Sequence, residues 1–163
     1  KHLSVREYLA REVKRRKLEI NRENLIEVAN DIRKKYSPSH IVEELYKEAS
    51  RSKYPVVIES IRTEGEVEAL QKKTDFILIA VDADRKTRYK RSIKRNSKTD
   101  NLTYEDFVKV EEREMHSNNK GKQNLTKCIE MADIVISNNG TIENLRKQIK
   151  NYINSSRSLH SSP

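Results

Sequence analysis

Glycine is scarce in this chain, with only Gly65, Gly121 and Gly140 among 163 residues. A Walker phosphate loop needs two glycines five positions apart, followed by a lysine and a hydroxyl residue. None of the three glycines begins such an arrangement. The chain therefore contains no phosphate loop of its own.

Cysteine is almost absent, and this excludes several classes of site. The single Cys128 rules out an internal disulfide and suits a reducing compartment, so we expect a cytoplasmic protein. A zinc deaminase site is excluded because its H-x-E and P-C-x-x-C elements need more cysteines. The histidines show no metal-ligand spacing, so we assign no metal site to protein ligands. These histidines are His2, His40, His116 and His160.

Long hydrophobic runs are also missing, because no apolar stretch approaches the roughly 18 residues of a membrane span. No signal peptide is visible either, and we expect no membrane partner. What the chain has instead is charge: 36% of its residues are charged, and its formal net charge is +9. This excess favours phosphate-rich partners, either nucleotides or nucleic acid.

Three short apolar runs predict strands: Val56–Glu59, Phe76–Val81 and Ile134–Ile136. All-apolar runs are typical of strands buried on both faces of a parallel sheet. The segments between them have helical patterns, so we expect right-handed crossovers and an α/β fold, a layered parallel sheet with helices on both faces. Residues 1–153 predict one domain, and the Ser-rich residues 154–163 predict a disordered tail or linker.

Capping residues predict where the helices begin. Ser4 with Glu7 matches a capping box for a helix to about Arg16, preceded by the end of a strand at residues 1–3. Asn21 caps a second helix, and Ser37-Pro38 provides the N-cap and first residue of a third, ending near Ser50. Further helices are expected from Thr63 to about Lys73, after Asp82-Ala83-Asp84, after Thr103, around Leu125–Ala132, and from Thr141 to about Ile153.

Glu59 and Arg62 follow the first full strand and form the strongest candidate site. Ligands of open α/β sheets bind beyond the carboxyl ends of the strands. A guanidinium can hold two phosphate oxygens, and a carboxylate can orient a hydroxyl or hydrated Mg²⁺. The alternative is an ordinary turn in which Arg62 pairs with Glu64 or Glu66.

The segment from Arg85 to Lys98 carries eight cations and no acid. Arg88, Arg91 and Arg95 share one helical face, and such crowding favours a nearby anion. The segment could form a flap over phosphates, or simply a solvated basic surface.

Weaker candidates lie elsewhere. Arg6 and Arg11 lie on the first helix, where salt-bridged or solvated arginines are common. Asn138, Asn139 and Gly140 could expose backbone groups to a base edge, or form a plain left-handed turn. Cys128 lies on an apolar helical face and predicts a core residue.

Four segments of the chain look familiar when they are taken together: residues 57–68 (VIESIRTEGEVE), residues 79–84 (IAVDAD) with the basic helix that follows, residues 128–140 (CIEMADIVISNNG), and residues 3–9 (LSVREYL). They resemble parts of dephospho-CoA-kinase-like and nucleoside-monophosphate-kinase-like P-loop enzymes. In that order, they resemble a strand that ends in an acid followed by arginine, the strand leading to the lid, the final strand with its base-proximal turn, and the start of the nucleotide-accepting helix. The resemblance covers most of residues 1–153.

The resemblance implies an ATP- and Mg²⁺-dependent phosphoryl transfer in the parent protein, to a nucleotide or dephospho-CoA-like acceptor. It implies that Arg62, together with Ser4, Arg6 and Arg11, binds the acceptor and that Glu59 lies near Mg²⁺. It also places Arg91 and Arg95 in the lid. On the accepting helix the direct match to the family's arginine is Ala10, with Arg11 beside it.

The family's first strand and phosphate loop have no counterpart in this chain, so the resemblance implies an incomplete domain with a gap between Val56–Glu59 and Phe76–Val81. The closest likeness is to the kinase-like domain that precedes the catalytic domain of some deoxycytidylate-deaminase-like proteins. A non-catalytic, nucleotide-binding regulatory domain is therefore one alternative. A nucleic-acid-binding domain working through the basic helix is another, although few aromatic residues accompany the charge.

Overall fold

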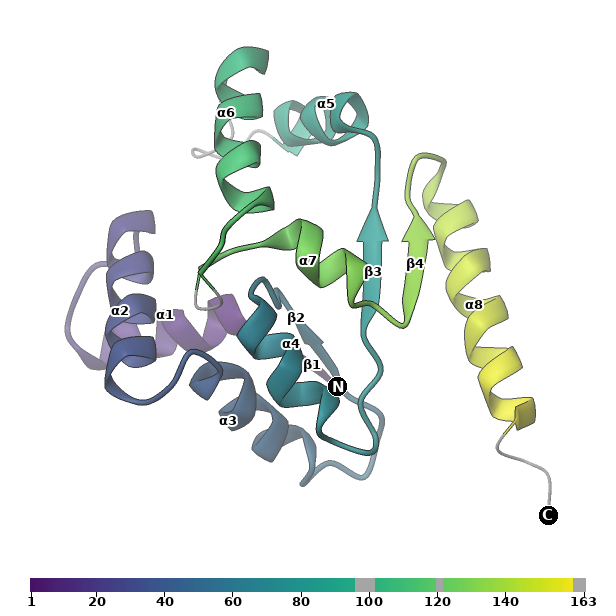
Figure 1. The fold of residues 1–163 in the computed structure, drawn as a ribbon, viewed down its shortest axis with the longest axis horizontal. Coiled ribbons are helices and arrows are strands. Elements are labelled where there is room, and N and C mark those ends of the chain that lie inside the picture. Colours follow the sequence, from purple (N-terminus) through teal and green to yellow (C-terminus); the bar gives the residue numbers. More distant parts are fainter. Residues whose placement is uncertain (96–101, 120–121, 160–163) are drawn as a thin grey trace. The chain divides into compact units, whose positions relative to one another are not determined.

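In a computed structural model, residues 1–95, 102–119 and 122–159 are described, and they contain eight helices and four short strands. The chain divides into two compact units (Figure 1). The N-terminal unit comprises residues 1–76 and 113–131, and the C-terminal unit comprises residues 77–112 and 132–163. No helix in the described ranges is long and apolar enough to cross a bilayer.

The N-terminal unit contains strands β1 (His2–Ser4) and β2 (Val57–Glu59), which pair in parallel and place Ser4 beside Glu59. Between them the chain forms three helices, and two more follow β2. These helices are α1 (Val5–Arg15), α2 (Arg22–Lys35), α3 (His40–Ala49), α4 (Glu64–Gln71) and α7 (Leu125–Glu130).

The core of the N-terminal unit forms where the apolar stripes of α1, α2 and α3 meet. Their buried side chains recur at the three- and four-residue spacing of an amphipathic helix. The Ser4 hydroxyl accepts a hydrogen bond from the Glu7 amide, and the Asn21 side chain accepts one from the Asn24 amide, which confirms both predicted caps. The buried core residues are Leu3, Val5, Leu9, Val13, Val28, Ala29, Ile32, Ile41, Val42, Leu45 and Leu70.

A capping box begins α4 and buries a carboxylate. The Thr63 hydroxyl accepts from the Glu66 amide at 3.2 Å, and Glu66 Oε2 accepts from the Thr63 amide at 3.2 Å. Glu66 is only 1% exposed, and its Oε1 lies 3.2 Å from Arg33 Nη2. Because a buried charge is costly unless it is paired, Arg33 on α2 is what allows Glu66 to be buried here.

The C-terminal unit contains strands β3 (Ile79–Asp82) and β4 (Ile134–Ser137), which also pair in parallel. Its helices are α5 (Arg85–Arg95), α6 (Tyr104–Met115, whose last turn belongs to the N-terminal unit) and α8 (Ile142–Leu159). Helix α8 lies beside β4 (Figure 1), and Gln148 Nε2 donates to the Ser137 carbonyl at 2.8 Å. The Thr103 hydroxyl accepts from the Asp106 amide, as its predicted capping role requires.

These elements confirm a mixed α/β fold with parallel strands, but the predicted burial of the strands is wrong. Val57 is 63% exposed, Ile79 is 42% exposed and Val81 is 51% exposed. In the described part of the chain each strand is bonded to one neighbour only. Apolar sequence alone predicts what a strand can bury, whereas the neighbouring layers determine what it does bury.

Three predicted boundaries also differ from the structure. Helix α3 begins at His40 rather than Pro38, because residues 37–40 form a turn in which the His40 amide donates to the Ser37 carbonyl. Strand β3 begins at Ile79 rather than Phe76. Helix α8 continues to Leu159. Serine and asparagine cost a helix only a few tenths of a kcal/mol each, so they do not end it as proline would.

We predict that Glu66→Gln lowers the free energy of unfolding by about 3 kcal/mol, the lower end of the range for breaking a buried ion pair. The amide cannot neutralise Arg33, whose buried Nε already has no hydrogen-bond partner among the described residues. Urea denaturation at pH 7 measures the change. Glu23→Gln, on the exposed face of α2, is the matched control, and a loss below 1 kcal/mol for Glu66→Gln would contradict this assignment.

Candidate functional site

Glu59 lies at the carboxyl end of β2, where its side chain is exposed. Its Oε2 is 3.7 Å from Nε2 of His2, a contact that is ionic only when the histidine is protonated. The β1–β2 register places Ser4 directly beside Glu59. The carboxylate is therefore at the strand end as predicted, and the Glu59 side chain is 48% exposed.

The chain turns sharply between Glu59 and Arg62. Ser60 has a φ of 70°, in the left-handed region that residues other than glycine rarely adopt. A left-handed residue of this kind costs about 1–3 kcal/mol, and it persists where its surroundings determine it. Here the Arg62 amide donates to Glu66 Oε2 at 2.9 Å, and the Arg62 carbonyl accepts from the Asn124 amide at 2.9 Å. Both sides of the Arg62 peptide backbone are thus fixed.

The guanidinium of Arg62 is held far more loosely than its backbone. Its Nη1 lies 3.5 Å from Glu114 Oε2 and 3.4 Å from Gln123 Oε1, and the side chain is 43% exposed. Within the described residues, Nε and Nη2 make no hydrogen bond. The alternative in the sequence analysis paired Arg62 with Glu64 or Glu66. In the structure Glu66 accepts a hydrogen bond from the backbone amide of Arg62, not from its guanidinium.

The other residues predicted to bind an acceptor are spread along α1. Ser4 is buried and its hydroxyl caps the helix. Arg6 is exposed and makes no ion pair with any described residue. Arg11 lies 4.0 Å from a Glu48 oxygen and stacks its guanidinium over Tyr8. The structure therefore leaves Arg6 available to a ligand, whereas Arg11 already has partners.

The cations of α5 are divided between two roles, and Arg88 has a structural one. Its Nε and Nη2 bind the two oxygens of Glu111 at 2.6 and 2.8 Å. Its Nη1 binds Asp82 at 2.8 Å and also the Ala83 carbonyl. Arg85 Nε adds a third bond to Glu111 at 2.9 Å. The sequence analysis expected an anion near these crowded cations, and in the structure that anion is Glu111 of α6.

Glu111 is buried, and two opposing effects act on its pKa. Burial alone would raise the pKa, but the hydrogen bonds and charges of Arg88 and Arg85 outweigh burial and leave the pKa of Glu111 below its ordinary value. The same hydrogen bond to Glu111 raises the pKa of Arg88. The cluster is therefore fully ionised at neutral pH.

Arg91 connects α5 to the turn after β4. Its Nη1 donates to the Asn138 carbonyl at 2.6 Å and its Nη2 to the Gly140 carbonyl at 3.0 Å. The Asn139 side chain accepts from the Asp84 amide at 2.7 Å. Gly140 does not adopt the left-handed conformation, so the plain left-handed turn is wrong. The C-terminal unit thus brings Arg91 together with residues 138–140, and Arg95 lies exposed one turn further along α5.

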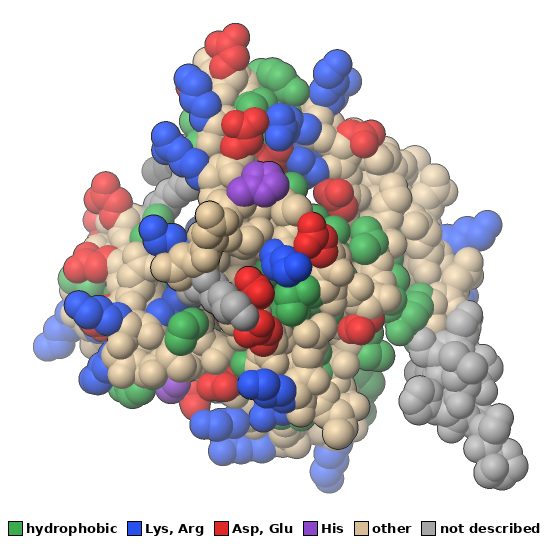
Figure 2. All heavy atoms as spheres, viewed as in Figure 1, with side chains coloured by type: hydrophobic (Ala, Val, Ile, Leu, Met, Phe, Trp, Pro, Cys, Tyr) green, Lys and Arg blue, Asp and Glu red, His purple; other side chains and the backbone are tan. Residues whose placement is uncertain are grey.

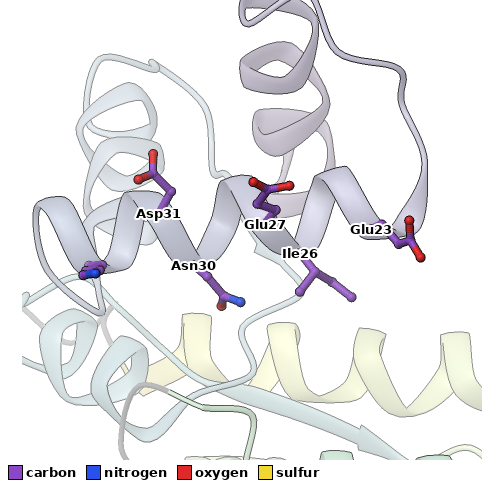
Figure 3. Close-up of a pocket in the computed structure, with 6 residues that line it drawn as sticks. Glu23, Ile26, Glu27, Asn30 and Asp31 are labelled. Carbon is purple, nitrogen blue, oxygen red and sulfur yellow. The ribbon is translucent and has the colours of Figure 1, made fainter.

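Two hollows in the N-terminal unit lie away from these residues. A groove of about 530 Å³ runs along the exposed face of α2, where Glu27 and Asp31 project to one side and Ile26 and Asn30 to the other (Figure 3). A second hollow of about 340 Å³ lies between the start of α3 and α4 and is lined by Ser39, Gly65 and Lys72 among others. Neither hollow is lined by a predicted site residue.

Acidic and basic side chains are interspersed over the face of the molecule in view (Figure 2). In the part of the chain that the structure describes, no three His, Cys, Asp or Glu side chains gather as metal ligands. Cys128 is buried as predicted, and burial raises the pKa of its thiol to about 11, which keeps it protonated.

Three residues that the sequence analysis did not name contact the predicted arginines: Glu111, Glu114 and Gln123. Glu66 was named only as an alternative partner of Arg62, although Thr63-x-x-Glu66 is a capping-box pattern. A local signal also existed for Glu111. Glu111 interrupts the apolar stripe formed by Val108 and Met115, a place where an acid needs a partner. Nothing local marks Glu114 or Gln123, because their contacts with Arg62 span 52 and 61 residues of sequence.

Comparison with known proteins finds relatives among archaeal UPF0200 proteins. The chain is 31% identical to a UPF0200 protein of Staphylothermus marinus over 124 residues, which cover 76% of the chain and 62% of that protein. It is 31% identical to a UPF0200/UPF0201 protein of Archaeoglobus fulgidus over 148 residues, 85% of the chain and 43% of that protein. A UPF0200 protein of Methanosarcina mazei is 28% identical over 148 residues, 89% of the chain and 76% of that protein.

The chain thus spans less than two thirds of the length of the first two relatives. No family model matches the sequence. The names of these relatives state no activity, so the function must be argued from the site itself.

We predict that Glu111→Gln lowers the free energy of unfolding at pH 7 by about 2 kcal/mol, the scale of one charged hydrogen bond. Because folding lowers the pKa of Glu111, its stabilisation is complete above the ordinary glutamate pKa and disappears as the pH falls through the folded pKa. The wild type should therefore lose stability on acidification more steeply than the variant. Urea midpoints between pH 7 and pH 3 measure both slopes.

The matched control is Glu105→Gln, an exposed position on the same helix. Parallel acid limbs for the wild type and Glu111→Gln would show that the Arg85–Arg88–Glu111 cluster does not stabilise the fold.

Proposed function

We propose that this chain is part of a nucleotide-kinase-like domain in which Arg62 binds the phosphate of an acceptor. In the parent protein the domain transfers the γ-phosphoryl group of ATP, with Mg²⁺, to a nucleotide or dephospho-CoA-like acceptor. The chain by itself lacks the phosphate loop that such a transfer requires, so its own contribution is acceptor binding and lid closure.

One observation carries this proposal: Arg62 has a fixed backbone and a guanidinium of which two nitrogens, Nε and Nη2, bond no described residue. Nε and Nη2 form one edge of the guanidinium fork, the geometry that accepts two phosphate oxygens at once. Arg88 and Arg85 are engaged by Glu111, and Arg91 is engaged by backbone carbonyls. Of the predicted phosphate contacts, Arg62 combines the firmest placement with a free donor edge at a strand end.

The strand edges support the finer fold that accompanies this function. Among the described residues β2 is bonded only to β1, and β3 only to β4. An unpaired strand edge presents a row of backbone donors and acceptors that a further strand can bond. One further parallel strand bonded to β2 would extend the β1–β2 pair toward the layered sheet that the resemblance implies, and it would carry the phosphate loop.

The remaining roles follow from the positions of the side chains. Glu59 has open carboxylate oxygens and fits a hydrated Mg²⁺, which would neutralise phosphate charge when bound. Arg91 and Arg95 belong to the lid helix α5. Residues 138–140 form the turn that receives Arg91 and would lie beside the base.

The nucleic-acid alternative loses part of its basis, because Glu111 and Asp82 already neutralise Arg85 and Arg88. It predicts duplex binding with a steep salt dependence that Arg62→Ala leaves unchanged. A regulatory nucleotide-binding role beside a deaminase domain stays a prediction, and it uses the same Arg62 site.

We predict that Arg62→Ala weakens binding of a nucleoside 5′-monophosphate about ten- to hundredfold, the effect of losing charged hydrogen bonds. Isothermal titration calorimetry on this chain measures the change. The matched control is Arg15→Ala, which removes an exposed arginine paired with Glu12 and should leave the affinity within twofold.

Unchanged affinity in Arg62→Ala would remove the basis of the proposal. A second test uses the product of the whole gene, assayed for phosphoryl transfer from ATP in the presence of Mg²⁺. A folded protein that never binds ATP would rule out the kinase activity and leave only acceptor binding.

A further inference from the structure

We infer that Asn139 is a site of spontaneous deamidation and that its isoaspartyl product detaches Arg91 from the turn after β4. Asn139-Gly140 is the one Asn-Gly pair in the sequence. It lies in the turn between β4 and α8. The inference concerns the chemistry of this turn and does not depend on the proposed function.

Deamidation joins an asparagine side chain to the backbone nitrogen of the next residue. Gly140 N gives its proton to hydroxide and attacks Cγ of Asn139. The new C–N bond closes a succinimide ring, and the Cγ–Nδ2 bond breaks to release ammonia after Nδ2 takes a proton from water. Water then opens the ring on one side to give aspartate, or on the other to give isoaspartate, whose backbone runs through the former side chain.

The nucleophile of this reaction is accessible in the structure. Asn139 and Gly140 are both exposed and lie outside helix and strand. The Gly140 amide donates no hydrogen bond to any described residue, so no such bond has to break before the nitrogen reacts. Gly140 also lacks a Cβ that would hinder the approach of its nitrogen to Cγ.

The electrophile is polarised by the fold. Oδ1 of Asn139 accepts a hydrogen bond from the Asp84 amide at 2.7 Å. Negative charge develops on this oxygen when the Gly140 nitrogen attacks Cγ, and a fixed donor at that position stabilises the charge as an oxyanion hole does. The Asp84 amide therefore favours the attack in the folded chain.

Neighbouring asparagines lack this combination. The nitrogen that would attack Asn144 belongs to Leu145, which lies in α8 and donates to the Thr141 carbonyl. Asn138 is followed by Asn139, whose Cβ hinders the approach. The turn therefore exposes one asparagine to deamidation and spares the two beside it.

The consequence follows from how the turn binds Arg91. Nη1 donates to the Asn138 carbonyl at 2.6 Å and Nη2 to the Gly140 carbonyl at 3.0 Å, so the two acceptors flank residue 139. An isoaspartyl linkage adds a methylene to the backbone between them and changes their separation. The donors of a guanidinium have a fixed spacing, so Arg91 cannot keep both bonds. The aspartyl product leaves the backbone length unchanged.

The test incubates the wild-type chain at pH 7 and at pH 9 and follows deamidation by mass spectrometry of tryptic peptides. Trypsin releases one peptide, residues 128–146, that contains Asn138, Asn139 and Asn144, so fragmentation compares them in the same molecule. In the folded chain Asn139 should react about tenfold or more faster than Asn144, because only Asn139 has an accessible attacking nitrogen. The rate should rise with pH, since the deprotonated amide is the nucleophile.

Gly140→Ala tests the role of the attacking residue. The added methyl should slow deamidation of Asn139 about tenfold or more, because displacing reacting atoms by about 1 Å can cost a hundredfold. Its Cβ would lie 2.9 Å from Asn144 Nδ2, the end of a flexible side chain that can move away. Gly65→Ala, the same exchange in α4, is the matched control and should leave the rate within twofold.

The purified peptide 128–146 provides the decisive comparison. If the peptide deamidates at Asn139 while the folded chain stays intact, the fold protects the turn and the inference is wrong. Equal rates at Asn139 and Asn144 in the folded chain, or an unchanged rate in Gly140→Ala, would also overturn it.

The detachment of Arg91 has its own readout. The isoaspartyl form, separated by chromatography, should have a lower urea midpoint than Asn139→Asp, which represents the aspartyl product. In Arg91→Ala, which has no guanidinium to detach, isoaspartate should cause no comparable shift. Equal midpoints for the isoaspartyl form and Asn139→Asp, or the same shift in Arg91→Ala, would show that the modification does not act through Arg91.

Discussion

The carboxylate of Glu66 fixes the segment on which the candidate site depends. It accepts the amide protons of Arg62 and Thr63 with one oxygen and faces Arg33 of α2 with the other. It therefore caps α4, orients the turn after β2, and ties both to the three-helix core. The left-handed Ser60 is tolerable because the residues on its C-terminal side are held in this way.

A second buried carboxylate organises α5 in a similar way. There one buried carboxylate, Glu111, gathers Arg85 and Arg88, and so determines which cations of the helix are structural. Arg91 does not contact Glu111. It donates to two neutral backbone carbonyls, so these contacts do not cancel its charge. A basic helix that seems uniform in sequence thus contains one part that pairs with carboxylates and another that bonds to neutral carbonyls.

The features that the sequence predicts correctly are local ones. Ser4, Asn21 and Thr103 cap helices within three residues, so their side chains find the same partners in almost any fold. The parallel strands follow from helices between apolar runs. Burial of those strands could not be predicted, because it depends on neighbouring layers. The partners of Arg62 could not be predicted either, because they lie on segments 52 and 61 residues away.

The contrast between Arg62 and Arg88 shows how a ligand-binding arginine differs from a structural one. Arg88 uses every nitrogen of its guanidinium within the protein, and it therefore has nothing to offer a ligand without breaking the α5–α6 contact. Arg62 is anchored through its backbone amide and carbonyl. Its guanidinium makes only long contacts with described residues, through Nη1. An anion that binds there gains charged hydrogen bonds. The backbone is already ordered and loses no further conformational entropy on binding, and this preorganisation raises the affinity. Backbone anchoring combined with a loosely held guanidinium is thus the physical reason to place the ligand at Arg62.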